Sequence, residues 1–124
     1  MLVLDTNILI AHLGGEVEVV RKFVAWRKEN ISLAVSVITE CELLSYPRLR
    51  PGEEERIERF LKDSFVSFPF DNRMARRAAR IRRTVKVELA DAAIAALALE
   101  MQASLVTRNI KDFQKIPSLS IVTF

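Results

Sequence analysis

Cysteine and histidine are almost absent from this sequence, and their scarcity excludes several kinds of site. The single cysteine, Cys41, cannot form an internal disulfide, and the chain cannot build an all-cysteine metal site. The single histidine, His12, excludes histidine-rich zinc sites and makes a serine triad hard to assemble. Any metal chemistry in this chain would therefore depend on carboxylate ligands.

The sequence also lacks a targeting segment and a long apolar run. Its first apolar residues, 1–4, are interrupted by Asp5 and follow no basic segment, which is unlike a signal peptide. The most apolar later stretch, Leu89 to Leu99, is 11 residues long and contains Asp91, so it is too short and too charged to span a bilayer. We therefore expect a cytoplasmic protein that does not associate with membranes.

Length and composition predict one domain over residues 1–124. Half of the 124 residues are hydrophobic and 28% are charged, so the chain can form a hydrophobic core and wholesale disorder is not expected. The net charge is +3, which permits a polyanionic partner without requiring one.

Short apolar runs alternate with amphipathic segments along the chain. The expected strands are 2–4, 31–35, 65–68, 105–107 and 119–122, and the expected helices include 16–30, 53–64, 71–86, 89–101 and 111–113. Ser36 is placed to cap a further helix, on which Val37, Cys41 and Leu44 would face inward. This alternation predicts an α/β fold, an α/β/α sandwich with a parallel sheet covered on both faces. Ligands of such sheets bind beyond the carboxyl ends of the strands.

Three acidic residues occur where solvent exposure does not explain them. Asp5 directly follows the first strand, and Asp91 is the only charged residue between Leu89 and Leu99. Glu40 lies among the residues expected to face inward on its helix. A buried carboxylate without a partner destabilises the fold or becomes protonated, so each of these three acids needs a compensating group.

Each acid taken alone also has a purely structural interpretation. Asp5 and Asp91 can be helix N-caps, and Glu40 can pair with an arginine at a helix surface. Together they favour a shared site, because all three fall near points that gather at one edge of a parallel sheet. Converging anions repel unless a cation lies among them, and an all-oxygen cluster is what Mg²⁺ or Mn²⁺ selects. Since no activated Ser, Cys or Lys accompanies them, the expected nucleophile is metal-activated water.

The segment after the fourth expected strand supplies two further candidates. Asn109 can offer a neutral carbonyl ligand or orient a water molecule. Asp112 can reach the same edge of the sheet or cap the short helix beside it. The sequence leaves both alternatives open.

Four sequence blocks carry a resemblance to the PIN domain family. They are Leu-Asp-Thr-Asn from residue 4, Ile-Thr-Glu-Cys-Glu-Leu-Leu from residue 38, Leu-Ala-Asp-Ala-Ala-Ile-Ala-Ala from residue 89, and Val-Thr-Arg-Asn-Ile-Lys-Asp-Phe from residue 106. The blocks occur in the family's order, and the chain is most similar to the single-domain VapC-type toxins of toxin–antitoxin pairs. The resemblance implies a five-stranded parallel sheet in the order 3-2-1-4-5 and a Mg²⁺- or Mn²⁺-dependent endoribonuclease.

The resemblance also implies a set of site residues and partners. The implied catalytic residues are Asp5, Thr6, Glu40, Asp91, Asn109 and Asp112, of which the four acids would bind the metal. Glu42 is two residues from Glu40, about 200° around the helix, and is not expected to share the cluster. The implied partners are an RNA substrate, a cognate antitoxin and a second copy of the chain.

Other functions compete with this interpretation. The chain can be an RNA-processing PIN nuclease outside a toxin system, or a PIN-like domain that binds RNA or protein without catalysis. A phosphotransfer protein built on an aspartate after the first strand is disfavoured, because Asp5 is followed by Thr-Asn with no second acid two positions on.

Positive charge is concentrated between Asp71 and Lys86. This segment holds seven basic residues and one acidic residue, a net charge of +6, so the rest of the chain carries −3. Arg73, Arg77 and Arg80 lie on one face of the expected helix and can contact RNA phosphates. The alternatives are a solvated helix face and arginines reserved for a protein partner, since no aromatic residues are interleaved to stack on bases.

Overall fold

The computed structural model describes residues 1–123, so Phe124, the last residue of the predicted domain, lies outside the described residues. The elements in chain order are β1 (Leu2–Leu4), α1 (Thr6–Leu13), α2 (Val17–Lys28), β2 (Leu33–Ser36), α3 (Val37–Leu44), α4 (Glu53–Ser64), β3 (Val66–Phe68), α5 (Asn72–Thr84), α6 (Leu89–Glu100), β4 (Ser104–Val106), α7 (Ile110–Phe113) and β5 (Ile121–Val122). No helix within the described range is both long and apolar enough to cross a membrane.

The strands form one parallel sheet in the order β3-β2-β1-β4-β5, which confirms the predicted order. Strand β1 is central, and its Val3 is paired with Ala34 of β2 and with Leu105 of β4. The chain proceeds from β1 to β2 and β3 on one side, then crosses to β4 on the other side of β1. The carboxyl end of β1 is therefore the switch point at which open α/β sheets bind ligands.

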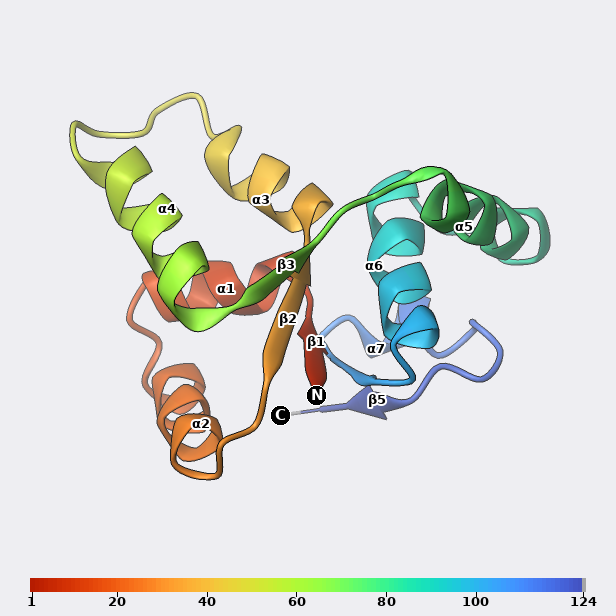
Figure 1. Cartoon of the computed structure of the whole chain (residues 1–124), viewed down its shortest axis with the longest axis horizontal. Helices are drawn as coiled ribbons and strands as arrows, with labels where there is room; N and C mark the ends of the chain where they lie inside the picture. The colour runs from red at the N-terminus through yellow and green to blue at the C-terminus, as the bar shows by residue number, and fades with distance from the viewer. Residues whose placement is uncertain (124) are drawn as a thin grey trace.

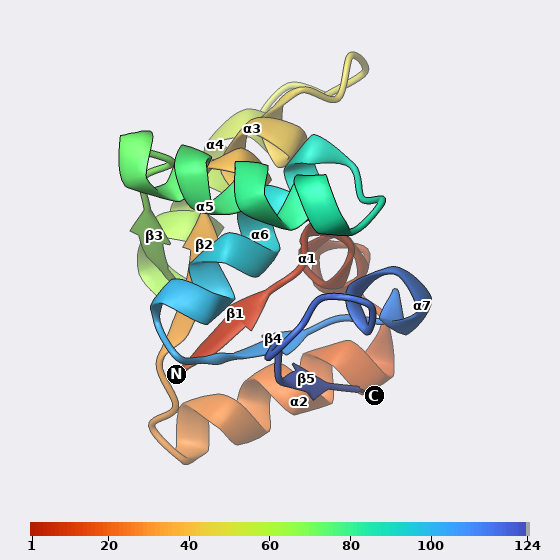
Figure 2. The same cartoon turned by 90° about the vertical axis from the view of Figure 1, so that its right-hand side faces the viewer.

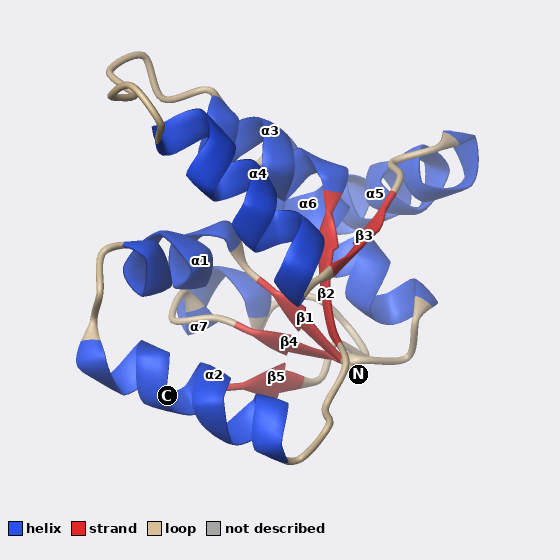
Figure 3. Ribbon diagram, turned by 60° about the vertical axis from the view of Figure 1, so that its left-hand side comes forward, coloured by secondary structure: helices blue, strands red, loops and turns tan. Residues whose placement is uncertain are grey.

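Helices cover both faces of the sheet, as predicted for an α/β/α sandwich. In Figure 1 the helices α1, α2 and α4 lie on one side of the sheet, and α5, α6 and α7 lie on the other. Figure 3 shows the strands side by side between these layers. Successive residues of a strand alternate between the two hydrophobic cores: Val3 packs in the core under α5 and α6, and Leu4 packs in the core under α1 and α2.

Helix α6 is the most deeply buried helix of the described chain. Every residue from 92 to 98 is buried, and five of these seven residues are alanine. The small side chains let α6 lie close to the sheet while α5 packs across its outer side (Figure 2). Its first turn, which carries Asp91, is thereby held in a fixed position.

Several element boundaries differ from the prediction by one or two residues. Strand β2 begins at Leu33, whereas the sequence predicts a start at residue 31. The cause is the end of α2, where Asn30 adopts a left-handed conformation (φ 56°) and the Ile31 amide bonds back to the Trp26 carbonyl. The chain leaves this turn two residues later than predicted. Strand β5 is also shorter than the predicted segment 119–122.

Candidate active site

Four acidic side chains gather around the carboxyl end of β1. Asp5 follows β1 directly, Glu42 comes from α3, Asp91 from the first turn of α6, and Asp112 from α7. Asp5, Asp112 and Glu42 lie near enough to Asp91 for the negative charge of each to raise the pKa of Asp91. We call these four residues the acidic cluster.

Asp5 is the buried member of the acidic cluster, with 4% of its surface exposed. It is the N-cap residue of α1, but its side chain makes no capping hydrogen bond, so the interpretation of Asp5 as a simple cap is wrong. Its Oδ2 instead accepts a hydrogen bond from Thr107 Oγ1 at 2.8 Å. Burial raises the pKa of Asp5, as does the charge of Glu42, and the hydrogen bonds from Thr107 and from the Thr6 backbone oppose this rise.

Thr107 connects the loop after β4 to the carboxylate after β1. Its side chain is fully buried. The hydroxyl donates its one proton to Asp5 and accepts a hydrogen bond from the Asn109 backbone amide at 2.9 Å. Since both bonds have defined directions, the orientation of the Asp5 carboxylate is fixed by the adjacent strand.

Asp91 has the most strongly shifted pKa of the acidic cluster. Burial and then the charges of Asp5, Asp112, Glu42 and Glu88 raise the pKa of Asp91 to about 6. The N-cap of α6 is Glu88, so the interpretation of Asp91 as a helix cap is also wrong. At neutral pH the Asp91 carboxylate is ionised among like charges, which is unfavourable unless a cation is added.

The glutamate of this site is Glu42 and not Glu40. Glu42 Oε1 accepts a hydrogen bond from Thr6 Oγ1 at 2.6 Å, and the charge of Glu42 raises the pKa of both aspartates. Glu40 accepts a hydrogen bond from Ser67 of β3 and lines a groove beside the end of α4. The expectation that Glu40 shares the cluster and that Glu42 does not is therefore wrong.

The orientation of α3 explains this difference. Its buried residues are Thr39 and Leu43, whereas Cys41, which was expected to face inward, is exposed. Glu42 is three residues from Thr39 and so lies beside it on the helix surface. The apolar pattern of α3 does not reveal this side, because it is marked by a polar residue. Thr39 is buried, and its hydroxyl contacts that of Thr6.

Thr6 orders the Glu42 carboxylate. The Thr6 hydroxyl has one proton, which it donates to Glu42. The Thr39 hydroxyl, whose oxygen is 3.0 Å from Thr6 Oγ1, must therefore donate to Thr6. This chain of donors ends on the Glu42 carboxylate and fixes its position against α1.

Asn109 and Asp112 take different positions at the site. Asn109 Nδ2 donates a hydrogen bond to Asp112 Oδ2 at 3.0 Å. An ionised carboxylate only accepts hydrogen bonds, so the Asn109 amide group faces Asp112 with its NH₂ side. Since the charge of Asp112 also acts on Asp91, Asp112 is the residue of this segment that joins the acidic cluster, and Asn109 supports it.

The acidic cluster fits a divalent cation in charge and in ligand type. Within residues 1–123 no salt bridge reaches any of its four carboxylates. Over the same range, no three Asp, Glu, His or Cys side chains lie close enough together to form a ready-made metal shell. The negative charge of the four carboxylates is therefore not offset by a basic side chain within residues 1–123. A hard cation such as Mg²⁺ or Mn²⁺ prefers oxygen ligands and would offset this charge.

Comparison with known sequences agrees with this geometry. The sequence profile of the PIN domain matches residues 2–119. Ribonuclease VapC10 of Mycobacterium tuberculosis (strain ATCC 25618 / H37Rv) is 33% identical over 124 residues, covering 96% of this chain and 90% of the relative.

Solved structures are similar over nearly the whole chain. A toxin–antitoxin complex from Klebsiella pneumoniae matches with a TM-score of 0.83 and 32% identity, over 99% of this chain and 97% of that one. VapBC2 from Rickettsia felis, bound to a DNA fragment from its promoter, matches in fold with a TM-score of 0.84 and 23% identity, over 99% and 98% of the two chains. The chain therefore belongs to the PIN domain family and, within it, to the VapC-type proteins.

Proposed function

We propose that this protein is an endoribonuclease that requires Mg²⁺ or Mn²⁺ and hydrolyses RNA phosphodiesters. The acidic cluster carries this proposal, because it places four carboxylates at the switch point of the sheet with no salt-bridge partner among residues 1–123. The similarity to Ribonuclease VapC10 over 96% of the chain supports the same chemistry.

Residues around the acidic cluster hydrogen-bond to its carboxylates and so position them to bind a cation. When bound, the cation supplies Lewis acidity, which lowers the pKa of water and offsets negative charge at the phosphodiester. The four acids of the cluster would be its ligands. Thr107 holds Asp5, Thr6 holds Glu42, and Asn109 holds Asp112, so three of the four carboxylates have a fixed neighbour. Such supporting hydrogen bonds orient the ligands of a metal ion.

Cleavage of a mixed panel of RNAs tests the proposal. We expect the purified protein to cut RNA in Mg²⁺ or Mn²⁺, to lose all cleavage in EDTA, and to recover it when excess metal is added. A preparation of Asp5→Asn made in parallel controls for contaminating nucleases. The proposal fails if neither metal supports cleavage of any RNA in the panel, or if both preparations cut equally.

We propose further that this ribonuclease is the toxin of a toxin–antitoxin pair. The Klebsiella pneumoniae complex supports this proposal at 32% identity. An apolar groove between α1, α3 and α4 is lined by Ile10, Leu13, Leu43 and Tyr46, and Glu42 lies in the same groove. Ile10 and Tyr46 are exposed, which is typical of a protein-binding surface. A segment of an antitoxin bound in this groove would reach the acidic cluster at Glu42.

Growth of a bacterial host tests the toxin assignment. We expect expression of the wild type to arrest growth, and co-expression of a short protein encoded beside this gene to relieve the arrest. Ile10→Glu places a charge in the groove, so it is expected to keep RNA cleavage and growth arrest but to lose the relief. Normal growth with an active wild-type nuclease would instead favour an RNA-processing role. The homodimer and the cytoplasmic location stay predictions.

A further inference from the structure

We propose that RNA is held by an arginine stripe on α5, formed by Arg76, Arg80 and Arg83. This inference rests on the proposed ribonuclease function and names the surface that holds its substrate. Acidic residues alone repel a polyanion, so a nuclease of this kind needs cations near its acidic site. The segment 71–86 contains the positive charge of the chain, with seven basic residues against one acidic residue.

The geometry of α5 places the arginine stripe on its solvent side. Met74 and Ile81 belong to the buried face of α5, which packs against α6. At about 100° per residue, the stripe lies about 180–240° around the helix from Met74, opposite that buried face. All three arginines are exposed, and at about 1.5 Å per residue they extend over roughly 10 Å of helix.

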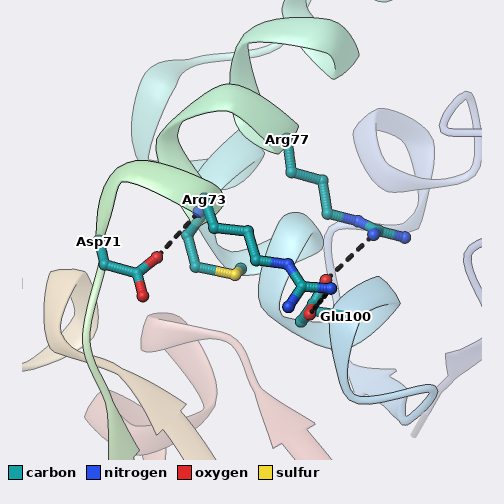
Figure 4. Close-up of polar contacts among 5 residues, drawn as sticks. Asp71, Arg73, Arg77 and Glu100 are labelled. Carbon is teal, nitrogen blue, oxygen red and sulfur yellow. Dashed lines mark hydrogen bonds and ion pairs between the residues drawn. The ribbon is translucent and has the colours of Figure 1, made fainter.

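Two other arginines of α5 are already paired. Arg73 Nη2 lies 2.8 Å from Glu100 Oε1, and Arg77 Nη1 lies 3.1 Å from Glu100 Oε2, so both oxygens of this carboxylate are used (Figure 4). Of the three arginines predicted to contact RNA, only Arg80 belongs to the stripe. In the part of the chain that the structure describes, no stripe arginine forms a salt bridge.

The composition of the stripe favours a polyanion over a protein partner. None of the large apolar side chains that are exposed in residues 1–123 lies on α5. The buried centre of a protein interface is more apolar than the rest of the surface, and the described residues of α5 expose no large apolar side chain that could form such a centre. Because the stripe also lacks aromatic residues to stack on bases, its contacts with RNA would be to phosphates and independent of sequence.

Helix α5 is fixed to the helix that carries Asp91. The helices α5 and α6 pack against each other, and the turn between them is held by Arg82 Nε, which donates to the Val87 carbonyl at 3.3 Å. The start of α5 is fixed by Asp71 Oδ1, which accepts from the Met74 amide at 3.0 Å (Figure 4). RNA bound along the stripe is therefore held on the same rigid helix pair as Asp91, one member of the acidic cluster.

Equal removal of charge from the arginine stripe and from the two arginines paired with Glu100 tests this inference. Binding of fluorescent single-stranded RNA is measured in EDTA, which prevents cleavage, between about 50 and 200 mM salt. We expect Arg76→Gln/Arg80→Gln to weaken binding about 10- to 30-fold at about 0.1 M salt, and to reduce the slope of log affinity against log salt by about 1.4. Arg73→Gln/Arg77→Gln removes the same charge from the same helix and should change affinity less than about threefold.

The outcomes separate this inference from the proposed function. Equal losses in the two double variants, or no loss in the stripe variant, would overturn the arginine stripe as the RNA surface. If the stripe variant instead weakened binding of the antitoxin alone, the stripe would be a protein surface. A wild type that binds RNA through the stripe but never cleaves it would contradict the nuclease and leave the stripe in place. Melting temperatures of all variants confirm that the fold is intact.

Discussion

Replacing Asp91 by asparagine is expected to reduce RNA cleavage at least about 100-fold and at the same time to stabilise the metal-free protein. Cleavage falls because the acidic cluster loses a ligand for the cation. Stability rises because the pKa of Asp91 is raised to about 6 by burial and by Asp5, Asp112 and Glu42, so its charge is unfavourable in the folded state.

The pH dependence follows from the direction of this shift. The folded protein binds the Asp91 proton more tightly than the unfolded chain, whose pKa is 3.8 at this residue. The free energy of unfolding therefore falls as pH rises from about 4 to about 6, and this contribution stays lost above pH 6. A shift of this size, discounted for the partial exposure of Asp91, corresponds to about 1–2 kcal/mol. Asp91→Asn should recover that amount at pH 7.5, which is roughly 4–8 °C in melting temperature.

Thermal unfolding in EDTA and in Mg²⁺, combined with RNA cleavage, measures both effects. Mg²⁺ should raise the melting temperature of the wild type and should raise that of Asp91→Asn much less. Glu88→Gln is the matched control for cleavage, since it removes one exposed charge from the N-cap of the same helix and should leave cleavage within about threefold. Its charge raises the pKa of Asp91 less than those of Asp5, Asp112 and Glu42 do, so Glu88→Gln should raise stability less than Asp91→Asn. Lower stability of Asp91→Asn in EDTA would show that Asp91 is not held among unbalanced like charges.

The architecture could be predicted because many residues along the chain contribute to the pattern of apolar and amphipathic segments. Five apolar runs separated by amphipathic segments predict a covered parallel sheet, and an error of two residues at β2 or β5 changes no strand pairing. The strand order came from the resemblance to the PIN domain, since periodicity alone does not distinguish the possible orders. Asp5 and Asp91 could be predicted because each is a lone charge beside or within an apolar segment.

The identity of the site glutamate could not be predicted, because α3 has apolar residues on more than one side. Val37, Cys41 and Leu44 suggest one inward face, and the observed one carries Thr39 and Leu43. In a helix of eight residues, a different choice of inward residue turns the expected face by about 100° or more. The orientation of α3 is set by its contact with α1, in which Thr39 meets Thr6. A contact between residues 33 positions apart cannot be predicted from the pattern of α3 alone.

The pairing of arginines on α5 also depends on tertiary contacts. Arg73, Arg77 and Arg80 share a face of the isolated helix, as predicted. Glu100 lies 23 residues beyond Arg77, and its salt bridges exist only because α6 packs against α5. A sequence pattern therefore finds the basic helix, and the structure shows which of its charges are available.

The two glutamates of α3 are expected to respond oppositely to the same substitution. Glu42→Gln should reduce RNA cleavage at least about 100-fold, because even groups that only orient a metal ligand contribute about 10- to 100-fold. Glu40→Gln should leave cleavage within about twofold, since Glu40 bonds to Ser67 away from the acidic cluster. The two variants differ by two positions on one helix and make the same chemical change, so each controls for the other.

The fold should survive both substitutions. In Glu42→Gln the side-chain carbonyl oxygen of the new amide can still accept the Thr6 hydroxyl, whose oxygen now lies 2.6 Å from Glu42 Oε1, so α1 and α3 keep their contact. Loss of the Glu42 charge should lower the pKa of Asp5 and Asp91, because that charge raises both. Cleavage rates in Mg²⁺ and Mn²⁺, with melting temperatures, measure the effect. An inactive Glu40→Gln together with an active Glu42→Gln would contradict the assignment of Glu42 to the acidic cluster. Glu40 would then be the site glutamate, as the sequence alone suggests.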